Sequence, residues 1–329
     1  MIDIVREVLD AENRIKRYIR ETPLDYSPFL SQKGNAKVYL KLENFQVTGS
    51  FKIRGVFNKL LSLSEEEKEN GIVTASSGNH GVAFAYATNV LNLRGVVFLP
   101  ENASPAKIQD IKQYNVELRF YGRDMVETET FARRFAKENE MTYVPPYNDP
   151  KVIGGQGTIG IELEKQLEKI DAVLIPVGGG GLISGVGGYL KETLKDVEII
   201  GVQPENSAVM YHSIKAGEIL EIESKPTLAD GTAGGIEEGS ITFDLCKKYV
   251  DDFILVSEEE IAKAITLMLE KHHMLIEGAA ALPVAAYLRD PTRFSGKNTV
   301  LIISGCRISL STLKKILESS NEKSKETNT

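Results

Sequence analysis

Apolar runs of strand length alternate with helix-periodic segments through most of the chain. The strand-like runs are KVYLKL, GIVTA, RGVVFLP, VELRFY, DAVLIPV, EIIGVQ, DFILV and NTVLIIS. Several are continuously apolar, which is typical of strands buried on both faces of a parallel sheet. Helical periodicity lies between most of them, over 81–90, 105–114, 125–139, 159–169 and 258–272. The alternation predicts an α/β fold with a largely parallel sheet.

The segment 71–143 is a strand–helix alternation in its own right and predicts a separate lobe. It is followed by YVPPYNDPKVIGGQG (143–157), whose Pro and Gly content predicts a crossover or hinge. We therefore expect a larger domain made of 1–62 and 149–329, and a smaller, mobile domain made of 63–148. The charged, amphipathic N-terminus predicts a helix rather than a signal peptide. The polar tail over 319–329 is predicted to be disordered.

Composition narrows the function classes. The 329 residues are 42% apolar and 26% charged, which is ordinary for a globular enzyme, and the net charge of −7 argues against nucleic acid as a partner. No apolar run approaches the length of a membrane span, so no membrane partner is expected. Cys246 and Cys306 show no CxxC spacing, and the four histidines show no metal-ligand spacing. A reduced, cytoplasmic protein with no metal site is the expectation.

Two loops that follow predicted strands carry candidate chemistry. The loop TASSGNHG (74–81) places Ser76, Ser77, Asn79 and His80 at a strand-to-helix turn, where free backbone amides can bind an anion. A helix cap alone would need one such residue. The loop VGGGGLISGVGG (177–188) has four consecutive glycines, which let a backbone curl around a phosphate. It matches neither the G-x-G-x-x-G nor the Walker pattern, and a closely packed strand–helix turn is the alternative.

A third loop, LIISGCRIS (301–309), places Ser304 at the end of the last predicted strand. Capping of the final helix explains this serine equally well. More informative is Lys52 in GSFKI, which is flanked by Phe51 and Ile53. Burial lowers the pKa of a lysine, and its free amine can then form an imine with an aldehyde. The alternative is a lysine whose stem packs on an apolar surface while its ammonium reaches water.

Taken together, the three loops and Lys52 predict a ligand with a phosphate, a ring and an electrophilic carbon. Pyridoxal 5'-phosphate meets that description. The motifs SFKIRG, SSGNHG, GGGGL, LADG, VDDFILVSEEEI and SGC, in this order over about 22–317, resemble the fold-type II pyridoxal-phosphate enzymes. The similarity is strongest to their serine/threonine dehydratase (threonine ammonia-lyase) and serine racemase branch. It implies a tryptophan synthase beta-like fold of two open, twisted, mostly parallel sheets flanked by helices.

The resemblance also implies roles for individual residues around the cofactor. Lys52 looks like the lysine that binds the cofactor covalently and later acts as general base. Asn79 matches the residue that bonds the ring hydroxyl, Ser304 the residue that faces the pyridine nitrogen, and Glu277 an acid near the ring. The expected phosphate cradle and its neighbours in the cofactor site are Gly178, Gly179, Gly180, Gly181, Leu182 and Phe51.

On the substrate side, the resemblance places four residues on the loop that takes the substrate carboxylate: Ser76, Ser77, Asn79 and His80. The implied reaction is elimination of water from L-threonine or L-serine, giving 2-oxobutanoate or pyruvate and ammonia. The implied assembly is a homodimer or higher homo-oligomer.

Several alternatives stay open at this point. Serine racemases have a serine at the position of Ser77 as a second base, so racemisation remains possible. Gln203, Ser207 and Val209 depart from the racemases' divalent-metal site, which argues against it. Arg307 and Ser309 stand where Asn and Asp are usual, which leaves substrate preference open, including a larger β-hydroxy amino acid. A non-catalytic amino-acid sensor on the same scaffold is the alternative from another class.

Overall fold

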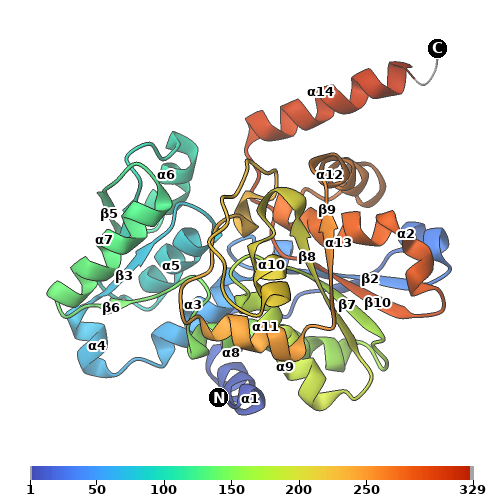
Figure 1. Cartoon of the computed structure of the whole chain (residues 1–329). Coiled ribbons are helices and arrows are strands. Elements are labelled where there is room, and N and C mark those ends of the chain that lie inside the picture. The colour runs from blue at the N-terminus through green and yellow to red at the C-terminus, as the bar shows by residue number, and fades with distance from the viewer. Residues whose placement is uncertain (1, 327–329) are drawn as a thin grey trace.

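The computed structural model describes residues 2–326, and its strands gather in two separate sheets (Figure 1). All eight predicted strand runs are confirmed, and two short strands, β1 and β6, are added to them. The strands are β1 (Leu24–Tyr26), β2 (Lys37–Leu42), β3 (Ile72–Ala75), β4 (Gly95–Leu99), β5 (Glu117–Phe120), β6 (Thr142–Tyr143), β7 (Ala172–Pro176), β8 (Glu198–Pro204), β9 (Asp252–Val256) and β10 (Asn298–Ile303).

Helices surround both sheets. Within 2–326 the α-helices are α1 (Ile4–Ile15), α2 (Pro28–Gly34), α3 (Lys52–Leu61), α4 (Glu65–Asn70), α5 (Asn79–Val90), α6 (Pro105–Lys112), α7 (Met125–Glu138), α8 (Pro150–Gln166), α9 (Gly181–Thr193), α10 (Val209–Ala216), α11 (Ile241–Tyr249), α12 (Glu258–His272), α13 (Gly278–Arg289) and α14 (Leu310–Glu326). Short 3-10 turns are η1 (Glu43–Phe45), η2 (Glu205–Ser207), η3 (Asp230–Thr232) and η4 (Pro291–Phe294).

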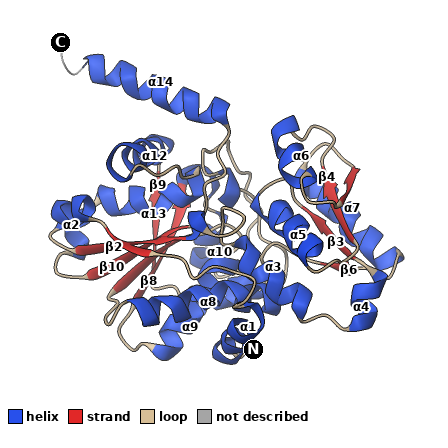
Figure 2. Ribbon diagram, turned by 180° about the vertical axis from the view of Figure 1, so that it is seen from behind, coloured by secondary structure: helices blue, strands red, loops and turns tan. Residues whose placement is uncertain are grey.

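The two sheets are open and mostly parallel, as the sequence predicted. In the described residues the larger sheet has the order β1-β2-β10-β7-β8-β9, and the smaller one has the order β5-β4-β3-β6. Only the β1–β2 pair is antiparallel among these. Figure 2 shows α2, α12 and α13 on one face of the larger sheet and α1, α8 and α9 on the other. Because both faces are covered, the strands are apolar along their whole length.

The smaller sheet is also covered on both faces. Its strands come from 72–143, inside the predicted smaller domain. One face packs against α5 and against the apolar side of α3, where Ile53, Val56 and Phe57 are fully buried. The other face packs against α7. Helix α3 therefore lies between the two sheets, and a domain boundary at residue 62 stays a prediction.

The hinge predicted over 143–157 is wrong from Pro150 onward, because Pro150–Gln166 is helix α8. Asp149 caps its start by accepting hydrogen bonds from two backbone amides, and Pro150 occupies the first turn. The glycines that suggested a loop allow close helix packing instead. A Cβ on Gly155 would lie 2.6 Å from the backbone of Arg54, and one on Gly157 would lie 3.0 Å from the carbonyl of Gly185.

The chain starts with the helix that the sequence predicted and ends in a helix that is longer than predicted. Helix α1 buries Val8, Ala11 and Ile15, which confirms the amphipathic N-terminal helix. Helix α14 runs to Glu326 and projects from the larger lobe (Figure 1). Residues 327–329 lie outside the described residues, and disorder of the tail stays a prediction. None of the helices in the described part of the chain is long and apolar enough to cross a bilayer.

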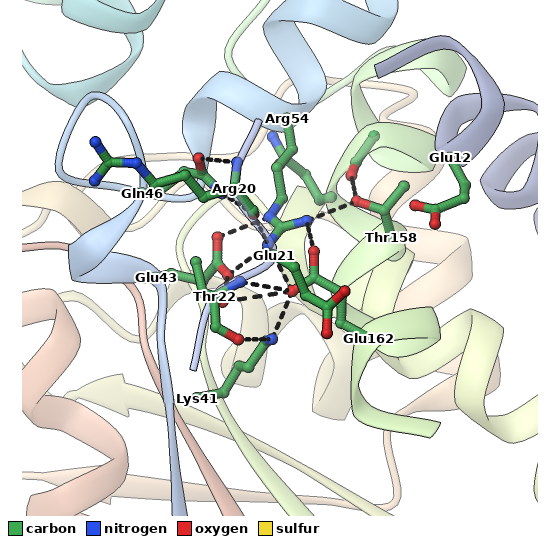
Figure 3. Close-up of polar contacts among 12 residues, drawn as sticks. Glu12, Arg20, Glu21, Thr22, Lys41, Glu43, Gln46, Arg54, Thr158 and Glu162 are labelled. Carbon is green, nitrogen blue, oxygen red and sulfur yellow. Dashed lines mark hydrogen bonds and ion pairs between the residues drawn. The ribbon is translucent and has the colours of Figure 1, made fainter. Parts of the chain in front are cut away.

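A buried group of charged side chains holds α3 in place (Figure 3). The Nε and Nη2 atoms of Arg54 donate to Glu43 at 2.8 Å. Its Nη1 and Nη2 atoms donate to Glu162 of α8 at 2.6 and 2.9 Å. Glu162 also accepts a hydrogen bond from Lys41 of β2. Two cations and two carboxylates thus join β2, α3 and α8, and this fixes the turn of α3 that begins at Lys52.

Candidate active site

A cavity of about 660 Å³ opens at the carboxyl ends of strands from both sheets. Ligands in open α/β folds bind at this edge. All the residues that the sequence singled out for cofactor and substrate line it, although they come from five separate parts of the chain. They are Phe51, Lys52, Ser76, Ser77, Asn79, His80, Gly178, Gly179, Gly180, Gly181, Leu182, Glu277 and Ser304. Their individual roles stay predictions.

Lys52 is the first residue of α3 and lies close to the end of β10. The amide of Phe51 donates to the carbonyl of Ser304 at 3.1 Å, which ties the start of α3 to the end of that strand. The ammonium of Lys52 donates to the carbonyl of Pro146 at 2.8 Å. Burial lowers the pKa of Lys52 to about 8, against the opposing charge of Glu277. The side chain faces the cavity instead of bulk water, so the amine is accessible to a ligand there.

The glycine loop joins β7 to α9 and leaves backbone amides free. Gly180 has φ +86 and caps α9, so this position favours glycine. A Cβ on Gly179 would lie 2.5 Å from the ring of Tyr147, and one on Gly181 would lie 2.9 Å from the Cβ of the same tyrosine. Side chains at these positions would collide with Tyr147. The bare backbone at a helix start suits a phosphate.

Ser304 lies at the end of β10, and its hydroxyl is buried without a hydrogen-bond partner in the structure. A buried polar atom in a native protein normally has a partner. Because Ser304 lines the cavity, a ligand atom can supply it. An accessible amine, a bare glycine loop and an orphaned hydroxyl in one cavity fit the aldehyde, phosphate and ring nitrogen of pyridoxal phosphate.

Glu277 stands before the first turn of α13 and is almost fully buried. Both of its oxygens accept from Nδ2 of Asn79, at 2.8 and 2.9 Å, and Oε2 also accepts from the backbone amide of Arg307 at 2.9 Å. Burial raises the pKa of Glu277 to about 7. The amide of Asn79 is therefore directed at Glu277, and its predicted bond to the ring hydroxyl stays a prediction.

The loop between β3 and α5 carries the predicted carboxylate site. Ser76 accepts a hydrogen bond from the amide of Gly78 at 3.2 Å. The ring of His80 lies 3.0 Å from the hydroxyl of Thr74 and 3.1 Å from the carbonyl of Val144. Burial, with the nearby charge of Lys52, lowers the pKa of His80 to about 3. The imidazole is neutral at physiological pH, so the anion-binding capacity of this loop lies in its hydroxyls and in the first-turn amides of α5.

Other residues that line the cavity were not predicted from the sequence. Tyr147 packs against the glycine loop, and its hydroxyl accepts from the amide of Glu237 at 3.1 Å. The segment 230–237 also lines the cavity, and its Gly-rich composition, DGTAGGIE, was an available signal. Tyr147 had no comparable signal, because its partners are distant in the sequence.

Ion pairs cross the cavity between the helices of the smaller sheet and loops of the larger lobe. Lys107 of α6 lies 3.5 Å from Asp230. Arg133 of α7 lies 2.8 Å from Glu237. A third pair joins Arg307 to Asp110 of α6.

Two of the residues that differ from the metal site of the racemases, Gln203 and Ser207, form hydrogen bonds within the protein. Gln203 accepts from the amide of Tyr211 at 2.8 Å and donates to the carbonyl of Val177 at 3.2 Å. The hydroxyl of Ser207 lies 2.7 Å from that of Ser224. In the described residues, no group of three or more His, Cys, Asp or Glu side chains is arranged to hold a metal.

Comparison with known proteins identifies the family to which the chain belongs. Residues 15–305 match the family described as "Pyridoxal-phosphate dependent enzyme". The chain is 41% identical over 313 residues to the L-threonine ammonia-lyase of Thermotoga maritima, spanning 95% of this chain and 78% of that protein. It is 42% identical over 318 residues to the catabolic L-threonine dehydratase TdcB of Staphylococcus aureus, spanning 95% of this chain and 91% of that protein.

Solved structures share the whole fold. The processed form of threonine deaminase isoform 2 from Solanum lycopersicum superposes with a TM-score of 0.91 at 33% identity, covering 96% of this chain and 93% of that one. Maize serine racemase superposes with a TM-score of 0.89 at 30% identity, covering 97% and 98%. The chain thus belongs to the pyridoxal-phosphate dependent enzymes of fold type II, in the threonine dehydratase and serine racemase branch, and pyridoxal phosphate is its cofactor.

Proposed function

We propose that the protein is an ammonia-lyase that eliminates water from L-threonine, L-serine or both, giving 2-oxobutanoate or pyruvate and ammonia. The observation that carries the proposal is the position of Lys52, whose amine has a lowered pKa and shares a cavity with the glycine loop and Ser304. The activities named for the relatives from Thermotoga and Staphylococcus support the same reaction.

Each part of the cavity has a task in this reaction. When bound, pyridoxal phosphate supplies an electron sink that acidifies the Cα proton of the amino acid. Lys52 would hold the cofactor through its amine, and as a free amine it would act as the general base at the Cα proton. The glycine-loop amides hold the phosphate. The hydroxyl of Ser304, unlike a carboxylate, does not hold a ring nitrogen protonated, which favours elimination over transamination.

The direct test is incubation of the holoenzyme with L-threonine and L-serine, with keto acid and D-isomer measured together. We expect keto acid and ammonia in equal amounts. D-serine forming faster than pyruvate would overturn the proposal. A panel of β-hydroxy amino acids then ranks the substrates. Tight binding of an amino acid with neither product formed would instead support a sensor.

Racemisation is the second candidate, because Ser77 lines the cavity and serine racemases of maize and Dictyostelium discoideum share the fold. If the protein racemises, Ser77→Ala should abolish formation of the D-isomer and leave elimination from the L-isomer largely intact. If it only eliminates, the same change should alter mainly KM, through the carboxylate site, and any activity on D-serine.

We also propose that 63–148 moves as a unit relative to 1–62 and 149–329, and that the protein is a cytoplasmic homodimer. The ion pairs that cross the cavity support a closing motion, since they join the two lobes at its walls. The two free thiols, Cys246 and Cys306, fit a reducing compartment. Hydrogen exchange with and without substrate tests the motion, light scattering tests the dimer, and cell fractionation tests the location.

A further inference from the structure

Arg307 contacts several separate parts of the active site, and none of the roles described above explains these contacts. Its Nε atom donates to Oδ1 of Asn79 at 3.2 Å, and its Nη2 atom donates to the carbonyl of Thr48 at 3.2 Å. Its Nη1 atom forms an ion pair with Asp110 of α6. Its backbone amide donates to Glu277. One residue thus joins the loop before Lys52, the starts of α5 and α13, and a helix of the smaller lobe.

The hydrogen bond from Arg307 to Asn79 constrains the direction in which the side-chain amide of Asn79 points. A guanidinium has five donors and no acceptor, so the amide of Asn79 can face it only with its oxygen. The amide nitrogen must then point the other way, where both oxygens of Glu277 accept from it. The bonds to Glu277 favour the same orientation, and Arg307 holds the opposite side of the amide in place.

The bond to Asp110 links this orientation to the smaller lobe. Asp110 lies on α6, which packs beside α5 on the smaller sheet, whereas Arg307 follows β10 of the larger sheet. The side chain of Arg307 is 25% exposed and that of Asp110 is 41% exposed, so the pair is partly open to solvent and not in the core; Arg307 itself lines the cavity. Arginine suits this place because its planar fork presents three nitrogens to three separate acceptors, whereas all the donors of a lysine radiate from one nitrogen.

We propose that Arg307 is a positioning residue that orients the amide of Asn79 beside the cofactor and, through Asp110, makes that orientation depend on the position of α6. The inference rests on the proposed cofactor role of Lys52 and Asn79.

The test compares variants of the holoenzyme, first without substrate. Arg307→Met keeps an apolar stem and removes all three side-chain contacts. Arg307→Lys keeps the charge but not the fork. Asp110→Asn removes the ion pair and leaves the bond to Asn79 possible. Arg134→Met is the matched control, since Arg134 is exposed on α7, where it lies 4.0 Å from Glu138 and over the ring of Phe131. The readout is the pH at which the visible band of the lysine-bound cofactor titrates.

We expect Arg307→Met to move this midpoint by about half a pH unit or more, which is about a threefold change in the proton equilibrium. Arg307→Lys should not restore the wild-type value. Asp110→Asn should shift the midpoint in the same direction by less, and Arg134→Met should leave it unchanged. With L-threonine, kcat of Arg307→Met should fall about tenfold while KM changes less than about threefold.

An unshifted midpoint in Arg307→Met, or a raised KM with normal kcat, would overturn the proposal. If Arg307→Met does not fold, as judged by circular dichroism, Asp110→Asn decides alone, and a wild-type midpoint there counts against it. Because the titration needs no substrate, its result stands whether or not the protein is an ammonia-lyase.

Discussion

Lys52 and Arg54 are two cationic residues in the first turn of α3, and the protein treats them in opposite ways. Arg54 is fully buried, and its donors are satisfied by Glu43, Glu162 and Thr158. Those carboxylates and hydrogen bonds outweigh burial and raise its pKa. Lys52 has one hydrogen-bond acceptor, the carbonyl of Pro146, and burial lowers its pKa to about 8.

The difference separates a structural charge from a reactive one. A buried charge with complete partners is held in one protonation state and one position. A buried amine with few partners can lose its proton and form a new bond, which is what a cofactor aldehyde requires. The same contrast distinguishes Thr158, whose hydroxyl donates to the carbonyl of Gly155 at 2.7 Å, from Ser304, whose hydroxyl has no partner. In this cavity, the hydroxyl of Ser304 is left for a ligand atom.

The largest expected effect is on catalysis, from Lys52→Ala. Loss of the general base and of the covalent anchor should lower kcat by about a thousandfold or more, while the fold is kept. Keto-acid release under saturating L-threonine measures this. Borohydride treatment of the wild-type holoenzyme should attach the cofactor to Lys52, identified by peptide mass analysis. Label on any other lysine would show that Lys52 is not the reactive residue of the pair.

Arg54→Met tests whether Arg54 is the structural charge of the pair. It leaves Glu43 and Glu162 buried without their main partner and should destabilise the protein by about 3–5 kcal/mol. Lys52→Met should leave the stability of the cofactor-free protein unchanged or raised, since burial disfavours its ammonium. That cost is fully present below pH 8 and disappears as the pH rises toward 10.5. Urea unfolding of the cofactor-free proteins at pH 7 gives both values, and equal losses would contradict the comparison.

Gly180→Ala tests whether the glycine loop binds the cofactor phosphate. Gly217→Ala, at a glycine outside the site, is the matched control. Gly180 and Gly217 have φ of +86 and +84, so alanine strains the backbone equally at both, by about 1–2 kcal/mol. The Cβ at position 180 would also meet Met210 at 2.8 Å, whereas position 217 is open. We expect only Gly180→Ala to weaken cofactor affinity, by about tenfold, in a titration followed by absorbance. Equal affinity in both variants would argue against phosphate binding at this loop.

The smallest expected effect is on the pH dependence of cofactor capture. The free amine of Lys52 reacts, so the rate should rise about tenfold per pH unit below pH 8 and level off above it. A lysine of ordinary pKa would still be gaining rate at pH 9. Glu277→Gln should move the midpoint lower, because the Glu277 charge raises the pKa of Lys52. Stopped-flow absorbance with the cofactor-free protein measures both midpoints.

Much of the architecture could be predicted from the sequence because its signals are local. A continuous apolar run such as NTVLIIS identifies a buried strand without knowledge of its neighbours, and the predicted helix over 258–272 coincides with α12. The four glycines and the loop before α5 were found because each follows the end of a predicted strand, and Lys52 was found because apolar residues flank it. Parallel strands bring such ends to one edge of a sheet.

What the tertiary structure decided depends on which distant segments meet. The glycines of 154–157 indicated a loop, yet they form a helix because the backbones of α3 and α9 pack against them. The partners of Arg54 and Arg307 lie up to 108 and 259 residues away, in other elements of the fold. By itself, the sequence determined most of the elements and predicted the candidate lysine and the candidate phosphate loop, because residue type and spacing act over a few residues. Only the folded chain decided which charges are paired and which polar groups are left for the ligand, because pairing is a through-space property.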